Sequence, residues 1–297
     1  MGKIGSRTWL LMFIVSVLLF GTNGIVSNGI SLQSSQIVLL RTLIGSVVLI
    51  VIFLLMGNRF EFMKHRRSFF FIVVSGVSMG LSWLCLFEAY DKIGVGLATI
   101  EYYCGPIIVM ALSSVIFKEK FTAVKIIGFI TVFIGMLIVT LYGADISNDS
   151  AGIILGILSA VLMATMVISN KLATEITGME NPVLQLTVAF ITVFIGSLFG
   201  NSVSFEIMPN DVLPIIVLGL INTAFGCFLY FMALSHLKSQ SVAVLGYLEP
   251  LVAVILSILV LSESAGLLDA VGIIMVFVGS IICELYGNNP EERSESI

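Results

Sequence analysis

Residues 247–263 read YLEPLVAVILSILVLSE, and this stretch decides the fold. It is apolar and nearly long enough to cross a bilayer as a helix, which takes about 20 residues. Near its start, however, Glu249 is followed at once by Pro250. A carboxylate is costly in hydrocarbon, and a proline removes a hydrogen bond from the interior of a helix. The pair predicts that this part of the helix faces a polar cavity, where water, a partner group or a bound proton compensates the carboxyl group.

The whole chain is similarly apolar. Of its 297 residues 58% are hydrophobic and only 11% are charged, and the mean hydropathy is +1.13. This composition predicts an all-α integral membrane protein. The net charge of −4 reflects acidic loops and an acidic tail, and it gives no indication of nucleic-acid binding. We expect neither a metal site nor a disulfide framework, because no Cys/His pair has ligand spacing and all four cysteines lie in apolar runs: Cys85, Cys104, Cys227 and Cys283.

Ten stretches are long and apolar enough to span a membrane as helices. The first follows Lys3 and Arg7, as a signal peptide would, but it is too long and lacks a small-residue cleavage site. We therefore interpret it as the first transmembrane helix. The polar tail, residues 287–297, is expected to be disordered. The ten predicted spans are residues 8–28, 34–56, 69–91, 96–117, 124–142, 151–173, 181–200, 212–236, 240–262 and 268–286.

The basic residues of the loops predict the orientation in the membrane. If the N-terminus is cytoplasmic, twelve basic residues fall on the cytoplasmic side and only Lys92 falls outside. With an even number of spans both termini are then cytoplasmic, in a multi-pass protein of the plasma membrane. The outer loops carry Asp145, Asp149, Glu206, Asp211 and Glu263 instead. The twelve basic residues are Lys3, Arg7, Arg59, Lys64, Arg66, Arg67, Lys118, Lys120, Lys125, Lys171, Lys238 and Arg293.

The chain also repeats itself. At a shift of 144 residues, residues 69–143 match residues 213–287 at 18 of 75 positions without a gap. Apolar bias inflates chance identity, so the rarer residue types are the informative ones. Arg41 meets Gln185 at the same shift. The matches include Tyr103 with Tyr247, Pro106 with Pro250, Glu119 with Glu263, Gly128 with Gly272, and Gly135 with Gly279.

Each half holds five predicted spans, which is an odd number. The second half therefore enters the membrane with the opposite orientation, and we predict one five-helix repeat at residues 8–142 and an inverted repeat at residues 151–286. Inverted repeats of this kind are typical of transporters, with a substrate site near the midplane between the halves.

On these residues the chain resembles the EamA-type transporter family of the drug/metabolite transporter superfamily. The resemblance rests on the five-plus-five helices, on YLEPLVAVILSILVLSE, on its weaker copy YYCGPIIVMALSSVIFKE at 102–119, and on LLRTLIGSVVL at 39–49. It covers nearly the whole chain. It implies a carrier of small metabolites, often amino acids and commonly moved outward. It also implies a central cavity lined by the first, third, fourth, sixth, eighth and ninth helices. Glu101 departs from the family pattern, so a site built on it would be specific to this chain.

Two carboxyl groups and one arginine lie at membrane depth. Glu249 is close to the midplane, where it either lines a wet cavity or is hydrogen-bonded structurally to a neighbouring helix. Glu101 lies in the outer third of its helix, at a depth similar to Arg41, and a structural Arg41–Glu101 pair is one interpretation. We predict that at least one of the two carboxyls lines the cavity and that its protonation is linked to transport, Glu249 being the better candidate. Glu88, Asp91 and Lys171, near helix ends, are expected to snorkel toward water.

Prolines, aromatic residues and amides complete the predicted site. Pro106 and Pro250 free the carbonyl groups of Tyr102 and Gly246, which predicts kinks with a gating or site-lining role, or kinks that serve packing alone. Asn23 and Asn222 serve either as ligands or as hydrogen-bonded glue between helices. Gly76 and Gly80 indicate close helix packing. The candidate substrate-binding residues are Glu249, Glu101, Tyr103, Tyr247, Trp83, Tyr102, Asn23, Asn222 and Tyr230, with Pro106, Pro250 and Arg41 as structural or gating residues.

The function favoured by these features is secondary active transport, most simply export, of a small polar metabolite by alternating access. Two carboxyls against one arginine, with several tyrosines, favour a substrate with a positive group, such as an amino acid or an organic amine. The chain has no GxxxxGK[ST] motif for nucleotide binding. Both histidines lie in loops, so no membrane-embedded catalytic centre or cofactor is expected. A channel-like facilitator or a membrane scaffold without proton coupling is the alternative.

Overall fold

The structure is a computed structural model of the whole chain, and it describes residues 6–119, 122–141, 149–199, 206–260 and 267–286. Several residues used in the sequence argument lie outside these ranges, as does the side chain of Cys283. They are Lys3, Lys120, Asp145, Glu263, Arg293 and the tail 287–297.

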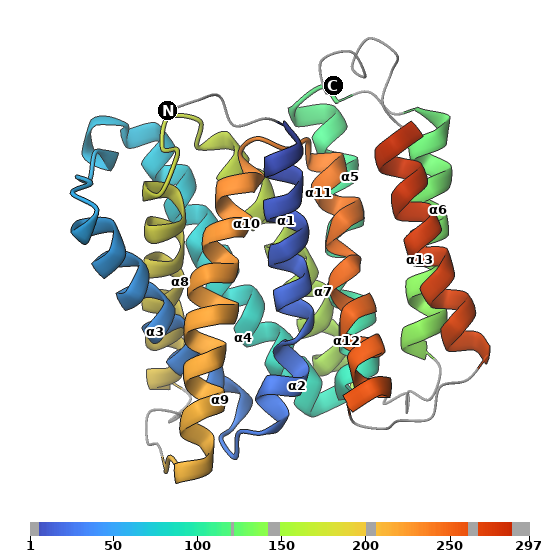
Figure 1. Cartoon of the computed structure of the whole chain (residues 1–297), viewed down its shortest axis with the longest axis horizontal. Coiled ribbons are helices and arrows are strands. Elements are labelled where there is room, and N and C mark those ends of the chain that lie inside the picture. Colours follow the sequence, from blue (N-terminus) through green and yellow to red (C-terminus); the bar gives the residue numbers. More distant parts are fainter. Residues whose placement is uncertain (1–5, 120–121, 142–148, 200–205, 261–266, 287–297) are drawn as a thin grey trace.

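The described chain is a bundle of helices without strands (Figure 1). Helix α1 begins, and α13 ends, at the same end of the bundle, as an even number of crossings requires. The α-helices are α1 (Ser6–Gly21), α2 (Asn23–Asn28), α3 (Ser34–Leu55), α4 (Arg66–Tyr102), α5 (Gly105–Ile116), α6 (Ala123–Leu141), α7 (Ser150–Leu172), α8 (Glu180–Phe199), α9 (Val212–Val217), α10 (Gly226–Leu234), α11 (Ser239–Gly246), α12 (Leu248–Val260) and α13 (Leu267–Tyr286). Two short 3₁₀ turns, η1 (Phe62–Lys64) and η2 (Pro209–Asp211), and a π-helix, η3 (Leu218–Phe225), complete the list.

Six helical segments of the described chain are long and apolar enough to cross a membrane. Three shorter apolar helices accompany them, at Gly105–Ile116, Ala123–Ile138 and Ala270–Ile282. Large apolar side chains point outward along these segments, as in Leu55 and Phe199, which are 81% and 87% exposed. In water such a surface would be unstable, so it indicates a lipid environment. The protein is therefore a multi-span membrane protein.

The predicted connection between the third and fourth spans, at residues 92–95, is not a break in helical structure. Helix α4 runs without interruption from Arg66 to Tyr102. The break comes later, at Tyr103 and Cys104, and α5 begins at Gly105. The sequence predicted the connection wrongly because Asp91 and Lys92 look like loop residues, whereas both lie on the helix and Lys92 pairs with Glu88 one turn earlier.

The helix break recurs at the matching place in the second half. Helix α4 ends at Tyr102 and α11 ends at Gly246, and 102 + 144 = 246. Each proline then falls within the first turn of a new helix, Pro106 in α5 and Pro250 in α12. A proline is tolerated there because its missing N–H would find no partner inside the helix anyway. The prolines therefore begin new helical segments after interruptions of only one or two turn residues, whose backbone stays close to the helical region, at the places where the sequence predicted kinks.

Helices α6 and α13 pack as a pair around four glycines. A Cβ atom on Gly135 would lie 2.8 Å from the carbonyl oxygen of Gly272, and one on Gly279 would lie 2.7 Å from that of Gly128. The shift of 144 exchanges these contacts, since 128 + 144 = 272 and 135 + 144 = 279. A residue that meets its partner's counterpart in this reciprocal way lies at an interface with local two-fold symmetry. The two helices stand together at one side of the bundle (Figure 1).

The same close packing occurs where α4 meets α8. A Cβ atom on Gly76 would lie 2.6 Å from Cβ of Val188, and one on Gly80 would lie 2.8 Å from Cβ of Thr192. This confirms that the two glycines of α4 form a packing face. It brings α4 of the first half against α8 of the second, and so holds the halves together around the residues described next.

Candidate functional site

Arg41 is buried inside the bundle, on α3, with 6% of its surface exposed. Its Nε donates a 2.9 Å hydrogen bond to the Thr223 hydroxyl of η3, and its guanidinium lies 4.9 Å from the centre of the Trp83 ring on α4. The groups near enough to interact with its charge are Cys227, Glu249 and Tyr102. Of these only Glu249 ionises readily as an anion, so it is the natural counter-ion for a guanidinium held away from water.

Glu249 lies in the first turn of α12, just after the break at Tyr247. The unpaired N–H groups at a helix start carry partial positive charge, which favours a carboxylate there. The carboxyl group also lies within hydrogen-bonding reach of the Tyr103 side chain and interacts with the charge of Arg41. Glu249 and Arg41 come from opposite halves of the chain, so this charge pair spans the repeat interface.

The two halves of the chain carry different residues at the positions equivalent to Arg41, Thr223 and Glu249. Arg41 corresponds to Gln185, and Thr223 corresponds to Met79, since 41 + 144 = 185 and 79 + 144 = 223. Gln185 Nε2 indeed lies 3.7 Å from the Met79 sulfur, which matches the Arg41–Thr223 contact. Glu249 has Gly105 as its counterpart. This contact therefore recurs in both halves, but the charges of Arg41 and Glu249 have no charged counterparts in the equivalent places.

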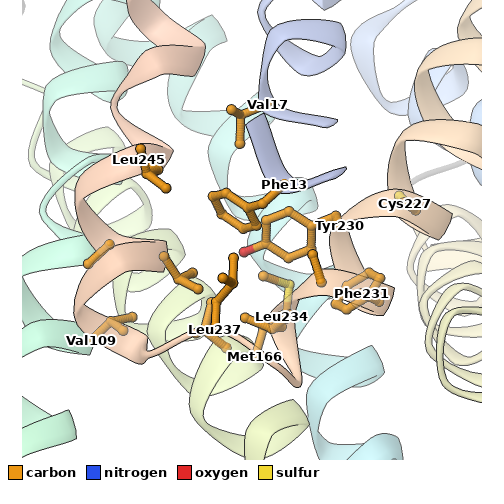
Figure 2. Packing of buried hydrophobic residues seen from close by; sticks show 14 of the residues in the cluster. Phe13, Val17, Val109, Met166, Cys227, Tyr230, Phe231, Leu234, Leu237 and Leu245 are labelled. Carbon is orange, nitrogen blue, oxygen red and sulfur yellow. The ribbon is translucent and has the colours of Figure 1, made fainter. Parts of the chain in front are cut away.

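Aromatic rings surround the charge pair. Tyr102 and Tyr103 pack edge to face with ring centres 5.3 Å apart, and Tyr230 interacts electrostatically with Glu249. The Tyr230 ring also lies 5.0 Å from that of Phe13, within the apolar cluster drawn in Figure 2. Trp83 covers the guanidinium from the α4 side. The rings provide apolar walls and π-faces around one anion and one cation.

Tyr247 has a structural position. It is fully buried, its ring centre lies 5.8 Å from that of Tyr103, and its hydroxyl donates a 2.7 Å hydrogen bond to the Tyr103 carbonyl oxygen. The bond joins the two helix breaks of the two halves. Of the predicted tyrosine pair, Tyr103 therefore presents its side chain to Glu249, and Tyr247 holds the backbone behind it.

Asn23 and Asn222 lie side by side and bond to each other. Asn222 Nδ2 has two N–H groups and three acceptors within reach: the Asn23 side-chain oxygen at 2.9 Å, the Thr22 hydroxyl at 2.7 Å and the Leu19 carbonyl oxygen at 2.9 Å. These groups stand at the interruption between α1 and α2. The π-helix η3 supplies Asn222 to this interruption and Thr223 to Arg41. The geometry favours the interpretation of the two asparagines as glue between helices.

Glu101 lies apart from the charge pair, so the predicted Arg41–Glu101 pair is wrong. Neither group is among the charged neighbours of the other. Glu101 instead packs on α7, where a Cβ atom on Gly156 would lie 1.8 Å from its Oε2. That oxygen is buried without a hydrogen-bond partner in the described structure. The sequence placed both residues at similar depth, but depth does not say which face of a helix a side chain takes.

Lys171 does not snorkel to water as predicted. It is partly buried and donates hydrogen bonds to the carbonyl oxygens of Leu234, at 3.3 Å, and Leu237. Glu88 and Asp91 do lie at the surface, and Glu88 Oε1 stands 3.6 Å from Lys92 Nζ. The prediction is therefore confirmed for the two acidic groups.

Sequence reasoning missed three residues beside the charge pair: Thr223, Cys227 and Tyr90. Tyr90 interacts with Glu249 and lies two helical turns after Trp83, so the helical period could have placed both on one face of α4. Cys227 corresponds to Trp83 in the repeat (83 + 144 = 227). The repeat could therefore have found it.

Comparisons with known proteins agree with this architecture. The sequence profile described as the EamA-like transporter family matches residues 7–141 and again residues 150–284. Two similar proteins are the uncharacterized transporter YxxF of Bacillus subtilis (strain 168), 22% identical over 92% of this chain and 88% of that protein, and the uncharacterized inner membrane transporter YicL of Salmonella typhimurium, 22% identical over 94% and 96%.

A solved crystal structure of a protein superposes with a TM-score of 0.82 at 14% sequence identity. The match covers 94% of this chain and 98% of that one, which shows a shared fold. The family profile matches both halves of the sequence and nearly all of its length. The chain belongs to the EamA-like transporter family.

Proposed function

We propose that this protein is a secondary active transporter that exports a small polar metabolite, and that Arg41 and Glu249 bind it. One observation carries the proposal: a buried arginine and a carboxyl group, contributed by opposite halves of the chain, lie within electrostatic range of each other beside aromatic rings inside an apolar bundle. Polar and ionisable groups inside membrane proteins are expensive, and they commonly mark substrate or ion pathways.

The charges define the kind of substrate. Because Glu101 lies elsewhere, the site holds one cation and one anion, and its balance differs from the two carboxyls expected from the sequence. A zwitterion satisfies both groups at once, with its carboxylate on Arg41 and its ammonium on Glu249. This supports an amino acid over a simple organic amine. The π-face of Tyr102, which lies near Glu249, adds about 0.5–2 kcal/mol of attraction for a cationic group.

Transport would proceed by alternating access between two inverted five-helix repeats, residues 8–142 and 151–286. The reciprocal contacts of α6 with α13 support the two-fold relation. The excess of basic residues in one set of loops supports ten spans with both termini cytoplasmic in the plasma membrane. A reporter fused after Asp149 should then read as external and one after Glu180 as cytoplasmic, and the opposite result at either site would refute the inverted arrangement.

A proton is the simplest coupling ion. Glu101 Oε2 is buried without a donor, and an ionised carboxylate in that position would be poorly compensated. A bound proton removes the charge. We therefore assign proton coupling to Glu101 and substrate binding to Glu249, whereas the sequence favoured Glu249 for the proton.

Flux in proteoliposomes tests the proposed function. Purified protein should carry radiolabelled amino acids saturably, and analogues that lack the carboxylate or the ammonium should compete at least tenfold less well. In the variants Arg41→Met and Glu249→Gln, this discrimination between amino acids and their analogues should disappear. Saturable flux of amines with full competition would refute the zwitterion site, and flux that does not saturate would indicate the channel-like alternative.

A further inference from the structure

The turn between α10 and α11, residues 235–238, is held on both sides by partly buried charges. On one side the two carboxylate oxygens of Glu119 accept hydrogen bonds from the backbone N–H groups of Ser239, at 2.9 Å, and Gln240, at 3.1 Å. On the other side Lys171 donates to the carbonyl oxygens of Leu234 and Leu237. Each charge therefore faces backbone groups of opposite partial charge.

The arrangement follows from the physics of helix ends. The first N–H groups of α11 and the last carbonyl groups of α10 have no partner within their own helices. A carboxylate at a helix start and an ammonium at a helix end are both favoured by the helix dipole. Glu119 and Lys171 also interact electrostatically with each other, and the Phe117 ring lies 5.8 Å from the Lys171 ammonium. We call Glu119, Lys171 and the turn they hold the clamp.

The clamp joins the two halves of the chain at one end of the bundle. Glu119 follows α5 in the first half, whereas Lys171 and the turn belong to the second. Two further contacts lie beside it: Lys125 Nζ donates to the Gln240 side-chain oxygen at 2.9 Å, and the Trp9 ring stacks on His236 at 3.9 Å. The start of α11 is buried behind these contacts, with Ser239 fully buried and Ala243 2% exposed.

We propose that the clamp is the gate that closes this end of the transport pathway, and that it must open in each transport cycle. The contacts are polar and local, and water replaces them when the halves separate. Release exposes the charges of Glu119 and Lys171 to solvent, which compensates them. The apolar core around Phe13 and Tyr230 could not part at comparable cost, because each buried ring would be transferred to water (Figure 2). This proposal is separate from the proposed substrate site. It rests only on the part of the proposed function by which a solute passes through the bundle.

A cross-link tests the gate directly. In a chain whose native cysteines are replaced by alanine, Glu119→Cys and Ser239→Cys are bridged with a short, reducible, thiol-reactive bifunctional reagent, and the mass confirms the bridge. The same chain before bridging gives the reference flux, because the replaced Cys227 lies beside the charge pair. Flux in proteoliposomes should fall at least tenfold and return on reduction. A bridge between Glu61→Cys and Lys64→Cys is the control, because that exposed pair, 2.6 Å apart, lies within one short turn. Full flux through the Glu119–Ser239 bridged protein would overturn the proposal.

A second measurement needs no substrate, so its failure differs from failure of the proposed function. Ala243→Cys is placed in the same cysteine-free chain, and its labelling by a membrane-impermeant maleimide is followed in detergent. Glu119→Gln together with Lys171→Met should raise the labelling rate at least tenfold, and Glu61→Gln should leave it unchanged. An unchanged rate in the clamp variant would show that these charges do not hold this end shut. The expected labelling result with no flux of any amino acid would refute the substrate assignment alone.

Discussion

The hydroxyl of Tyr247 donates a hydrogen bond of 2.7 Å to the backbone carbonyl oxygen of Tyr103, its own counterpart in the other half of the chain. The helix break at Tyr103 leaves that carbonyl without its usual partner, because the N–H of Ile107 bonds to Cys104 instead. The two tyrosines therefore have different roles at equivalent positions of the repeat. Tyr247 satisfies the broken backbone, and Tyr103 is left to turn its side chain toward Glu249.

Removing the Tyr247 hydroxyl should destabilise the fold. Tyr247→Phe leaves a buried carbonyl oxygen unsatisfied, which costs about 1–3 kcal/mol, and the thermal midpoint of the purified protein should fall. Tyr103→Phe is the matched control because it keeps that bond, so it should change substrate affinity more than stability. Equal loss of stability in both variants would contradict the division of roles.

The charge pair should show strong coupling. Arg41→Met alone leaves Glu249 without its nearby cation, so the free energy of unfolding should fall, whereas Arg41→Met with Glu249→Gln removes both charges and should recover part of that loss. The single and double variants together form a double-mutant cycle. The same cycle on the exposed pair Glu61–Lys64 should give a coupling energy of about 0–1 kcal/mol. Reversible unfolding in mixed micelles measures both cycles. Additive effects at Arg41 and Glu249 would show that the two groups do not interact.

The glycine contacts between α6 and α13 should tolerate no side chain. In Gly135→Ala the new Cβ would lie 2.8 Å from the Gly272 carbonyl oxygen, so backbone must move, at about 1–3 kcal/mol. Gly24→Ala is the control, because no atom beyond its chain neighbours and its own helix backbone lies within 4 Å of its Cβ position, and alanine favours helix. The thermal midpoint should fall for the first variant and hold or rise for the second. The reverse order would contradict the close packing.

The sequence predicted the helical membrane class, the family and the two-fold repeat, because periodicity and rare matched residues carry that information. It could not place the helix break at Tyr103. Helical hydrogen bonding continues past Asp91 and Lys92, and their charge looks like that of a loop. Once the break is known, the first-turn positions of Pro106 and Pro250 follow from the chemistry of proline.

The site was harder to predict than the fold. Arg41, Glu249 and Trp83 were identified as residues, but the partner of Arg41 was not, since depth along a helix leaves its rotation open. Lys171 illustrates the same limit, because its partners are carbonyl groups at a helix end, which no side-chain pattern records. Contacts set by backbone groups and by the rotation of helices became visible only in three dimensions.

The last prediction separates the two carboxyl groups. Glu249 has a cation and a phenol beside it, whereas Glu101 Oε2 has no hydrogen-bond donor in the described structure. We therefore expect Glu101→Gln, which keeps size and hydrogen bonding but cannot titrate, to abolish accumulation driven by a pH gradient in proteoliposomes. Exchange of substrate across the membrane needs no net proton movement, so it should survive in this variant.

Glu249→Gln should give the opposite pattern, since it removes the anion that faces the ammonium of the substrate. Affinity should fall at least tenfold, while the flux that remains should still respond to pH. Glu88→Gln, an exposed carboxyl on the same helix as Glu101, serves as the control and should change neither property. If Glu101→Gln and Glu249→Gln both transport with unchanged rate and unchanged pH dependence, both carboxyls are structural, and the zwitterion site and the proton assignment fail together.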